Sequence, residues 1–209
     1  MTIHMQELKV NEIFTSIQGE GPWIGRMCTF IRTQGCNLRC SFCDTQRAQD
    51  DSNSSLSFSS PDSLMDYLPL YPSNIIWTGG EPSLRIDFIE DVISSMGCGY
   101  NHAMETNGSI LFDTSLFDVV VISPKHPDYV EQWVDSKNVV FKFVVDSTTI
   151  GETIELCKQY DIQRAYLMPL GKSQDEIVIV SNDIIDYLKH PSYTDFILSP
   201  RLHILLGVQ

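Results

Sequence analysis

Short apolar runs alternate along this chain with stretches in which apolar residues recur at three- and four-residue spacing. The runs predict strands at residues 8–14, 28–33, 75–78, 102–105, 119–122, 139–145 and 165–168. The stretches between them predict helices at residues 61–68, 86–96, 128–135, 150–160 and 181–189. Repeated alternation of this kind predicts an α/β fold, in which helices cover a mostly parallel sheet.

We expect this sheet to be open. The predicted strands are too few for a full eightfold barrel, so they predict a partial, open β/α barrel that forms one domain over residues 1–209. One stretch, residues 49–60, is rich in Ser, Asp and Asn and predicts a flexible surface loop.

Polar or Gly-rich segments directly follow several of the predicted strands. They lie at residues 35–44, 79–82, 106–108 and 123–125. Because ligands bind at the carboxyl ends of the strands in α/β sheets, we expect these segments to converge on a single site.

The composition fits a globular protein that acts on a small molecule. The apolar fraction of 43% and the charged fraction of 20% are typical of a folded domain, and the apolar runs are too short to cross a membrane. Residues 1–10 lack the features of a signal peptide, so we expect a reducing, cytoplasmic location. The net charge of −13 argues against nucleic-acid binding, which relies on clustered Lys and Arg.

Three of the six cysteines are far apart in the sequence. Cys28, Cys98 and Cys157 have apolar or helical neighbours, and we predict that all three are small buried hydrophobic residues.

The other three cysteines form a C-x3-C-x2-C pattern at Cys36, Cys40 and Cys43. Three thiolates can hold a [4Fe–4S] cluster and leave one iron open to bind and reduce a substrate. Two alternatives stay open on the pattern alone. One is a zinc site completed by His102 or His126. The other is a thioredoxin-like redox pair at Cys40 and Cys43, which would leave Cys36 unexplained.

The cysteine spacing resembles the signature of the radical S-adenosylmethionine (radical SAM) superfamily. The resemblance implies that a cluster on these cysteines binds S-adenosylmethionine and cleaves it to a 5′-deoxyadenosyl radical, which abstracts hydrogen from a substrate. Residues 78–82, Thr-Gly-Gly-Glu-Pro, resemble the superfamily's glycine-rich motif, and residues 105–108 and 123–125 resemble its strand-end cofactor contacts. Cofactor binding is thereby implied for Gly80, Glu81, Glu105, Asn107, Ser123, Pro124, Lys125 and Pro169.

Within the superfamily, the chain resembles the 7-carboxy-7-deazaguanine synthases, most strongly over residues 12–45. The features are Glu-Ile-Phe-Thr-Ser-Ile-Gln-Gly-Glu-Gly at 12–21, a strand ending in Arg32, and Asp44-Thr45 after the cysteines. In that family 6-carboxy-5,6,7,8-tetrahydropterin loses a hydrogen from C6, its ring contracts and ammonia is lost. The product, 7-carboxy-7-deazaguanine, belongs to 7-deazapurine (queuosine-type) biosynthesis.

This second resemblance implies a substrate site. Ile17, Gln18, Gly19, Arg32 and Thr78 would contact the pterin, with the planar guanidinium of Arg32 paired to its carboxylate. Magnesium prefers oxygen ligands, and its implied ligand is Thr45. Without the resemblance, the same residues would be interpreted as an ordinary surface arginine and turn residues.

The resemblance further implies a homodimer and an electron donor such as flavodoxin. Residues 201–209 differ from the proline-containing tail of the family, so Gln209 receives no role. Two competing functions remain. An activating enzyme that places a glycyl radical on a partner protein would share the cysteines and residues 79–81 but would not need the pterin contacts. A zinc-stabilised binding module would need neither residues 79–81 nor the pterin contacts.

Overall fold

The computed structural model describes residues 7–50, 56–193 and 195–208. It divides into two compact units. The first consists of Met1–Ser16, Met27–Thr106 and Ile110–Val120, and the second of Ile17–Arg26, Asn107–Ser109 and Val121–Gln209. In the first unit the strands pair in the order β3-β1-β2-β4-β5-β6, and in the second in the order β6-β7-β8-β9. Strand β6 appears in both orders because its first half belongs to the first unit and its second half to the second.

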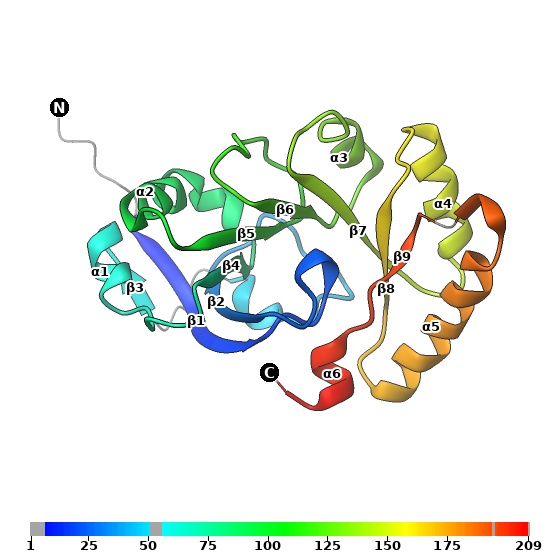
Figure 1. The fold of residues 1–209 in the computed structure, drawn as a ribbon, viewed down its shortest axis with the longest axis horizontal. Helices are drawn as coiled ribbons and strands as arrows, with labels where there is room; N and C mark the ends of the chain where they lie inside the picture. Colours follow the sequence, from blue (N-terminus) through cyan, green and yellow to red (C-terminus); the bar gives the residue numbers. More distant parts are fainter. Residues whose placement is uncertain (1–6, 51–55, 194, 209) are drawn as a thin grey trace. The chain divides into compact units, whose positions relative to one another are not determined.

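The strands, coloured along the chain in Figure 1, are β1 (Leu8–Ile17), β2 (Met27–Thr33), β3 (Leu56–Phe58), β4 (Asn74–Gly79), β5 (Asn101–Thr106), β6 (Val119–Ile122), β7 (Val139–Val145), β8 (Ala165–Pro169) and β9 (Ile197–Leu198). Strand β2 pairs in parallel with β4, β4 with β5, β7 with β8, and β8 with β9, whereas β1 and β3 pair antiparallel. The sheet is therefore mostly parallel. Within the described residues its order begins at β3 and ends at β9, so it is open, as predicted.

The α-helices are α1 (Pro61–Met65), α2 (Ile86–Met96), α3 (Pro127–Glu131), α4 (Ile150–Gln159), α5 (Gln174–Leu188) and α6 (Leu202–Leu206). Single 3-10 turns are η1 (Gly21–Trp23), η2 (Gln46–Ala48), η4 (Pro82–Arg85) and η5 (Pro191–Tyr193). No helix of the described ranges is long and apolar enough to span a membrane.

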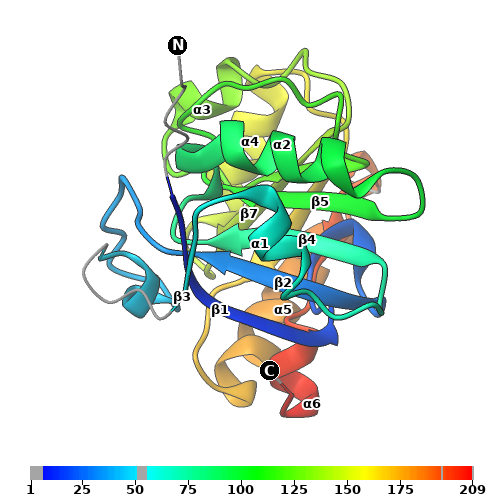
Figure 2. The same cartoon turned by 90° about the vertical axis from the view of Figure 1, so that its left-hand side faces the viewer.

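In the first unit, α1 and α2 lie side by side next to the strands (Figure 2). The buried face of α2 consists of Phe88, Ile89, Val92 and Ile93, the spacing expected of a helix with one apolar side. The helix is followed by Gly97, whose φ of 69° is a backbone conformation that glycine adopts without strain. The core of this unit includes Ile75, Ile76, Trp77 and Met104.

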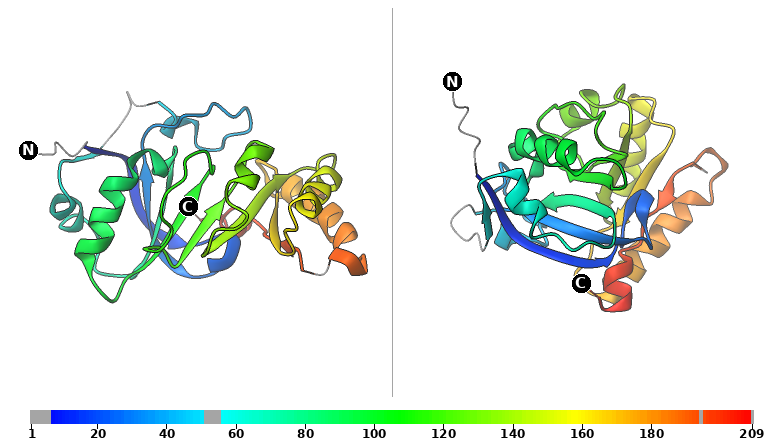
Figure 3. Two further views of the ribbon diagram at one scale, coloured as in Figure 1. Left: turned by 90° about the horizontal axis from the view of Figure 1, so that it is seen from above. Right: turned by 60° about the vertical axis from the view of Figure 1, so that its left-hand side comes forward.

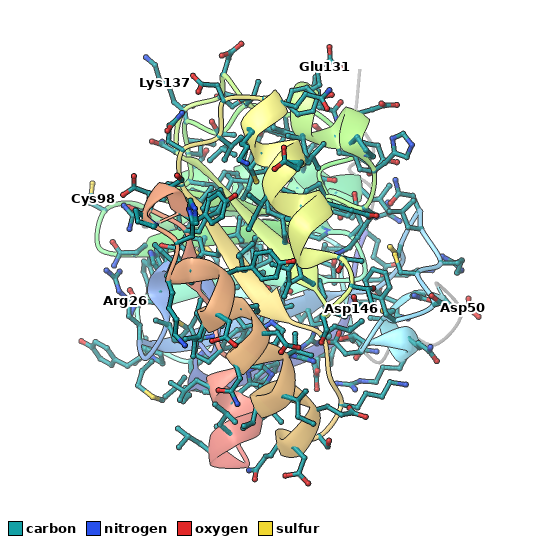
Figure 4. All side chains as sticks on the ribbon, turned by 90° about the vertical axis from the view of Figure 1, so that its right-hand side faces the viewer. Arg26, Asp50, Cys98, Glu131, Lys137 and Asp146 are labelled. Carbon is teal, nitrogen blue, oxygen red and sulfur yellow. The ribbon has the colours of Figure 1, made fainter. Side chains whose placement is uncertain are left out.

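In the second unit, α4 and α5 cover strands β7 and β8 (Figures 3 and 4). Every residue of β8 is buried, which explains its continuous apolar sequence. Helix α5 begins with a capping box, in which Ser173 and Glu176 satisfy each other's backbone N–H groups.

Several sequence predictions about elements are corrected by the structure. The helix predicted at 181–189 begins at Gln174, and β9 and α6 were not predicted. The predicted loop at 49–60 contains β3, which pairs with β1 through Leu8↔Phe58, while residues 51–55 lie outside the described residues. Strands of two or three residues are too short to show a periodic pattern.

One of the three scattered cysteines was also predicted wrongly. Cys28 and Cys157 are buried, as expected, but Cys98 is exposed and projects from the surface (Figure 4). It follows Gly97 in the turn after α2, so it has left the buried face of that helix.

Candidate functional site

The three clustered cysteines lie on the loop that follows β2. Cys36, Cys40 and Cys43 are all free thiols and half-buried. The Leu38 amide donates to Cys36 Sγ (3.4 Å), and the Cys43 amide donates to the Cys40 carbonyl (3.2 Å). Burial raises the pKa of the Cys36 thiol above its ordinary value, and the negative charge of Glu81 adds to this. To act as a metal ligand, Cys36 would therefore have to lose its proton to the incoming metal.

Three free thiols within one loop match, as a donor set, three of the four ligands of a [4Fe–4S] cluster. Across the described parts of the chain, no three His, Cys, Asp or Glu side chains are gathered as a ready-made metal site. This includes any Cys3His arrangement with His102 or His126. His102 is buried, and its Nδ1 accepts a hydrogen bond from Trp77 Nε1 (3.3 Å). To hold a cluster, the three thiols would have to close around it, on a loop whose base is fixed by the hydrogen bonds described next.

The base of the cysteine loop is closed by hydrogen bonds between its two ends. The Gly35 amide donates to the Ala48 carbonyl (2.8 Å), and the Cys36 amide donates to the Gln49 carbonyl (3.2 Å). The buried Gln34 side chain donates to the Arg47 carbonyl (2.9 Å) and accepts from Asn11 Nδ2 (2.9 Å). Gln34 was not predicted to belong to the site, because its partners come close to it only once the loop is closed.

The glycine-rich turn at the end of β4 packs directly on this base. The Gly80 amide donates to the Thr33 carbonyl (3.0 Å), and the Glu81 amide donates to the Gly35 carbonyl (2.8 Å). A Cβ atom on Gly80 would lie 2.0 Å from the Gly35 oxygen and 2.5 Å from the Ala48 oxygen. Only glycine allows this close approach.

The carboxylate of Glu81 connects the ends of two strands. It is buried and accepts from the Ser83 amide (3.0 Å), from Ser83 Oγ (2.7 Å) and from Thr106 Oγ1 (2.6 Å). These contacts tie the glycine-rich turn to the end of β5. Ser83 and Thr106, like Gln34, were not predicted to belong to the site.

Arg32, Thr78 and Glu105 form a row across the carboxyl ends of β2, β4 and β5. Arg32 is paired with Thr78 in the register of β2 and β4, and Thr78 Oγ1 donates to Glu105 Oε2 (3.5 Å). Arg32 Nη1 donates to Thr45 Oγ1 (3.3 Å), directly after the cysteine loop. The first unit thus brings together the predicted arginine, both threonines and Glu105 at one edge of its sheet.

In the second unit, residues 17–21 form a tight segment packed on the start of α6. The Gln18 amide donates to the Arg26 carbonyl (2.7 Å), and Gln18 Oε1 accepts from the Glu20 amide (3.1 Å). The Leu202 amide donates to the Gly19 carbonyl (3.0 Å). A Cβ atom on Gly19 would lie 2.1 Å from His203 Nδ1, so this position also requires glycine. Ile17 is the last residue of β1.

A buried ion pair anchors the same segment. Glu20 Oε2 is 2.5 Å from Lys142 Nζ, and Glu20 Oε1 is 3.4 Å from Arg201 Nε. Burial alone would raise the pKa of Glu20, but the attraction of Lys142 and Arg201 outweighs it and holds the pKa well below its usual range. The sequence signal for this contact is the one charged residue within the apolar run of β7.

The remaining predicted residues of the second unit lie at strand ends. Ser123, Pro124 and Lys125 directly follow β6, and Pro169 is the last residue of β8. Asn107 follows β5 and is buried, and its Oδ1 accepts from the Ser109 amide (2.9 Å).

Comparisons with known proteins agree with these observations. The Radical SAM superfamily model matches residues 30–178. A 7-carboxy-7-deazaguanine synthase of Hyperthermus butylicus is 33% identical over 95% of this chain and 92% of its own length. One of Bacteroides thetaiotaomicron is 31% identical over 96% and 98%. The crystal structure of QueE from Escherichia coli has the same fold, with a TM-score of 0.67, 21% identity and 92% of each chain covered.

Proposed function

Since the chain belongs to the radical SAM superfamily and, within it, to the 7-carboxy-7-deazaguanine synthases, we propose that it contracts the ring of 6-carboxy-5,6,7,8-tetrahydropterin. The product is 7-carboxy-7-deazaguanine, and ammonia leaves. The protein is accordingly a lyase of 7-deazapurine (queuosine-type) biosynthesis.

The contact between Arg32 and Thr45 is the structural observation that carries the proposal. Arg32 Nη1 lies 3.3 Å from Thr45 Oγ1, so a carboxylate bound by the guanidinium lies beside a hydroxyl oxygen. A guanidinium recognises carboxylate geometry, and a hydroxyl is an acceptable ligand for Mg2+. The pair therefore suits a carboxylated substrate held with a metal ion.

The superfamily uses a [4Fe–4S] cluster and S-adenosylmethionine. Cys36, Cys40 and Cys43 would hold the cluster, and Gly80 would let the methionine portion of the cofactor approach the backbone. Glu105, Asn107, Pro169 and residues 123–125 would contact the cofactor from strand ends. When bound, the two groups supply a carbon radical that takes hydrogen from C6 of the substrate.

Glu81 serves the cofactor through the backbone that it fixes. Its carboxylate is occupied by Ser83 and Thr106, so it holds the glycine-rich turn in place. We propose that Glu81 positions Gly80, and that the Gly80 backbone makes the contact to the cofactor.

The substrate residues have separate tasks. Arg32 would bind the carboxylate, Thr78 would contact the ring, and Thr45 would ligate Mg2+. Ile17, Gln18 and Gly19 would present backbone and amide groups to the pterin, whose edge offers several hydrogen-bond donors and acceptors.

Two further proposals, a homodimer and an electron donor such as flavodoxin, rest on the family alone. A cytoplasmic location and a single domain over residues 1–209 are proposed from the sequence.

Anaerobic turnover tests the proposed function. The protein is reconstituted with iron and sulfide, reduced, and incubated with S-adenosylmethionine, Mg2+ and carboxytetrahydropterin, and the products are identified by mass spectrometry. We expect 7-carboxy-7-deazaguanine, absent when either the cofactor or the reductant is omitted. Formation of 5′-deoxyadenosine without this product would support the radical SAM chemistry but would contradict the pterin as the substrate.

A further inference from the structure

We propose that Glu12 is a positioning residue that holds Arg32 by its Nε edge, so that only the Nη1–Nη2 edge of the guanidinium is presented to the substrate carboxylate. This inference rests on the proposed function, because it assigns the way in which Arg32 recognises that carboxylate.

The geometry around Arg32 fixes its guanidinium on three sides. Nε donates to Glu12 Oε1 (2.7 Å), and Nη1 donates to Thr45 Oγ1 (3.3 Å). The guanidinium carbon lies 5.8 Å from the centre of the Phe14 ring, within range of a cation–π contact. Phe14 is itself stacked on Phe30, with 4.8 Å between ring centres. The side chain is therefore held both in position and in the orientation of its plane.

A guanidinium can bind a carboxylate bidentately through two of its edges. One edge combines Nε with an Nη, and the other combines Nη1 with Nη2. Glu12 occupies Nε, so the first edge is unavailable to a ligand. The remaining edge includes Nη1, which lies next to Thr45. A carboxylate bound there is brought toward the proposed magnesium ligand.

Glu12 is itself held between two arginines. Glu12 Oε1 accepts from Arg47 Nη2 (2.5 Å) as well as from Arg32, so one anion faces two guanidinium groups. The three side chains together carry one net positive charge, and the Asp44 carboxylate, which accepts from Thr45 Oγ1 (3.0 Å), lies next to them. Burial alone would raise the pKa of Glu12, but the two arginines lower it, so Glu12 stays ionised at neutral pH.

Glu12 reaches Arg32 from a different strand, and Arg47 approaches from the far end of the cysteine loop. Arg47 Nε also donates to Asn11 Oδ1 (3.1 Å), next to Glu12 on β1. The Arg32 side chain is 18% exposed and that of Glu12 is 23% exposed, so both are accessible to a ligand but partly shielded from water. Loss of the Glu12 charge would let Arg32 rotate and would leave two guanidinium groups without their shared anion.

The test compares binding of two pterins to the reconstituted holoenzyme with S-adenosylmethionine and Mg2+. The ligands are 6-carboxypterin and 6-methylpterin, which share the ring and differ in the carboxylate, and binding is followed by pterin fluorescence. The variant is Glu12→Gln, which keeps the shape of the side chain and removes its charge. The matched control is Glu155→Gln, which removes the same charge from an exposed ion pair with Lys158.

We expect Glu12→Gln to weaken 6-carboxypterin binding about tenfold, the lower end of the effect that follows when the partner orienting a metal ligand is lost. Binding of 6-methylpterin should not change, and Glu155→Gln should behave as the wild type does. Glu12→Asp, which withdraws the carboxylate by one methylene, should give a smaller loss and provides a second variant if Glu12→Gln does not fold.

Three results would overturn the inference, two of them from the Glu12→Gln variant and one from the wild type. If Glu12→Gln kept the full preference for 6-carboxypterin, Arg32 would not depend on Glu12. If it lost affinity for both pterins equally, Glu12 would only support the structure. A wild-type protein without any preference for the carboxylated pterin would instead refute the substrate in the proposed function, and the inference with it.

Discussion

Arg32 and Glu81 are charged residues at the ends of neighbouring strands, and their surroundings suit them to different tasks. Arg32 is partly exposed, and its contacts with Glu12 and Thr45 leave N–H groups available to a ligand. Glu81 is 1% exposed, and its carboxylate accepts from Ser83 and Thr106. A charged side chain at a sheet edge can bind a substrate when some of its hydrogen-bond donors have no protein partner. A charged side chain that is buried and fully hydrogen-bonded instead holds the backbone in place.

Removing the guanidinium group of Arg32 should weaken substrate binding without affecting the iron–sulfur cluster. We expect Arg32→Ala to raise KM for carboxytetrahydropterin about thirtyfold, which corresponds to about 2 kcal/mol for a charge-assisted hydrogen bond. Arg32→Lys should recover part of this, because it keeps the charge but not the planar fork. Steady-state kinetics check the KM, and iron content checks the cluster. Loss of iron in Arg32→Ala would mean that the residue is structural.

Removing one of the three clustered cysteines should instead affect the iron–sulfur cluster itself. We expect Cys40→Ala to lose iron and sulfide after reconstitution and to lose cleavage of S-adenosylmethionine, because two thiolates cannot hold the cluster. Cys98→Ala is the matched control, since Cys98 is exposed and lies outside the cysteine loop. Substantial turnover by Cys40→Ala would refute the ligand assignment.

The sequence predicts residues at this scale when their role follows from their type and their position after a strand. Arg32, Thr78 and Glu105 lie at strand ends, as the strand predictions place them, while their roles stay predictions. Glu12 and Gln34 could not be found in this way. Glu12 meets Arg32 across neighbouring strands, and Gln34 meets Arg47 across a closed loop, so both contacts depend on pairing that one sequence does not state.

At the scale of elements, the glycine-rich turn and the base of the cysteine loop act as one packed unit. The Glu81 amide donates to Gly35, and Gly80 lies against the backbone of Gly35 and Ala48. Movement of either segment therefore displaces the other. This packing gives a structural reason for glycine at position 80 that is independent of the cofactor.

A methyl group on Gly80 should disturb both segments. We expect Gly80→Ala to lower the free energy of unfolding by about 1–3 kcal/mol, because its Cβ overlaps backbone atoms that cannot move aside easily. The variant should also cleave S-adenosylmethionine more slowly. Gly151→Ala in α4 is the control, because its Cβ would meet only the flexible Tyr187 hydroxyl, at 3.4 Å. Urea unfolding of the two variants makes the comparison, and equal midpoints would contradict the packing argument.

The Glu20–Lys142 pair fixes the segment at residues 17–21 to β7. Breaking one side of a buried pair leaves the other charge uncompensated, so we expect Lys142→Met to lower the free energy of unfolding by about 3–5 kcal/mol. The double variant Glu20→Gln with Lys142→Met should be more stable than the single variant. Urea unfolding measures both. A single variant as stable as the wild type would show that the pair contributes little.

Element prediction succeeded where burial produced a clear pattern and failed where it did not. Strands β6 and β7 and helix α2 have the predicted bounds, because their apolar residues are buried on the expected faces. Helix α5 was predicted seven residues too short at its start, where Val178 and Ile179 are exposed and break the one-sided pattern. The capping box at Ser173 and Glu176 was the better signal for its beginning.

At the scale of the whole molecule, the protein carries a net charge of −13, and several acidic residues have pKa values lowered by hydrogen bonds or nearby cations. The buried His102 also has a lowered pKa, but the cause is burial. Burial lowers the pKa of His102 from 6.5 to about 4, so the folded protein keeps this ring neutral.

This difference predicts a pH dependence of stability. Between pH 6.5 and 4 the unfolded chain binds a proton at His102 that the folded protein does not bind, so folding is disfavoured as the pH falls. The effect amounts to about 3 kcal/mol at the lower end. His102→Gln is neutral at every pH and should lack this contribution. We therefore expect the two stability curves to converge as the pH falls from 7 to 4, whereas parallel curves would refute the assignment.

Transfer of a deuterium label tests the central claim, radical ring contraction of the carboxypterin, most directly. Carboxytetrahydropterin labelled with deuterium at C6 is turned over anaerobically by the reduced holoenzyme, and mass spectrometry follows the label. We predict 7-carboxy-7-deazaguanine together with deuterium on the 5′ carbon of the recovered S-adenosylmethionine or 5′-deoxyadenosine. Product formed without any label on that carbon, or label transfer without the ring-contracted product, would contradict the account.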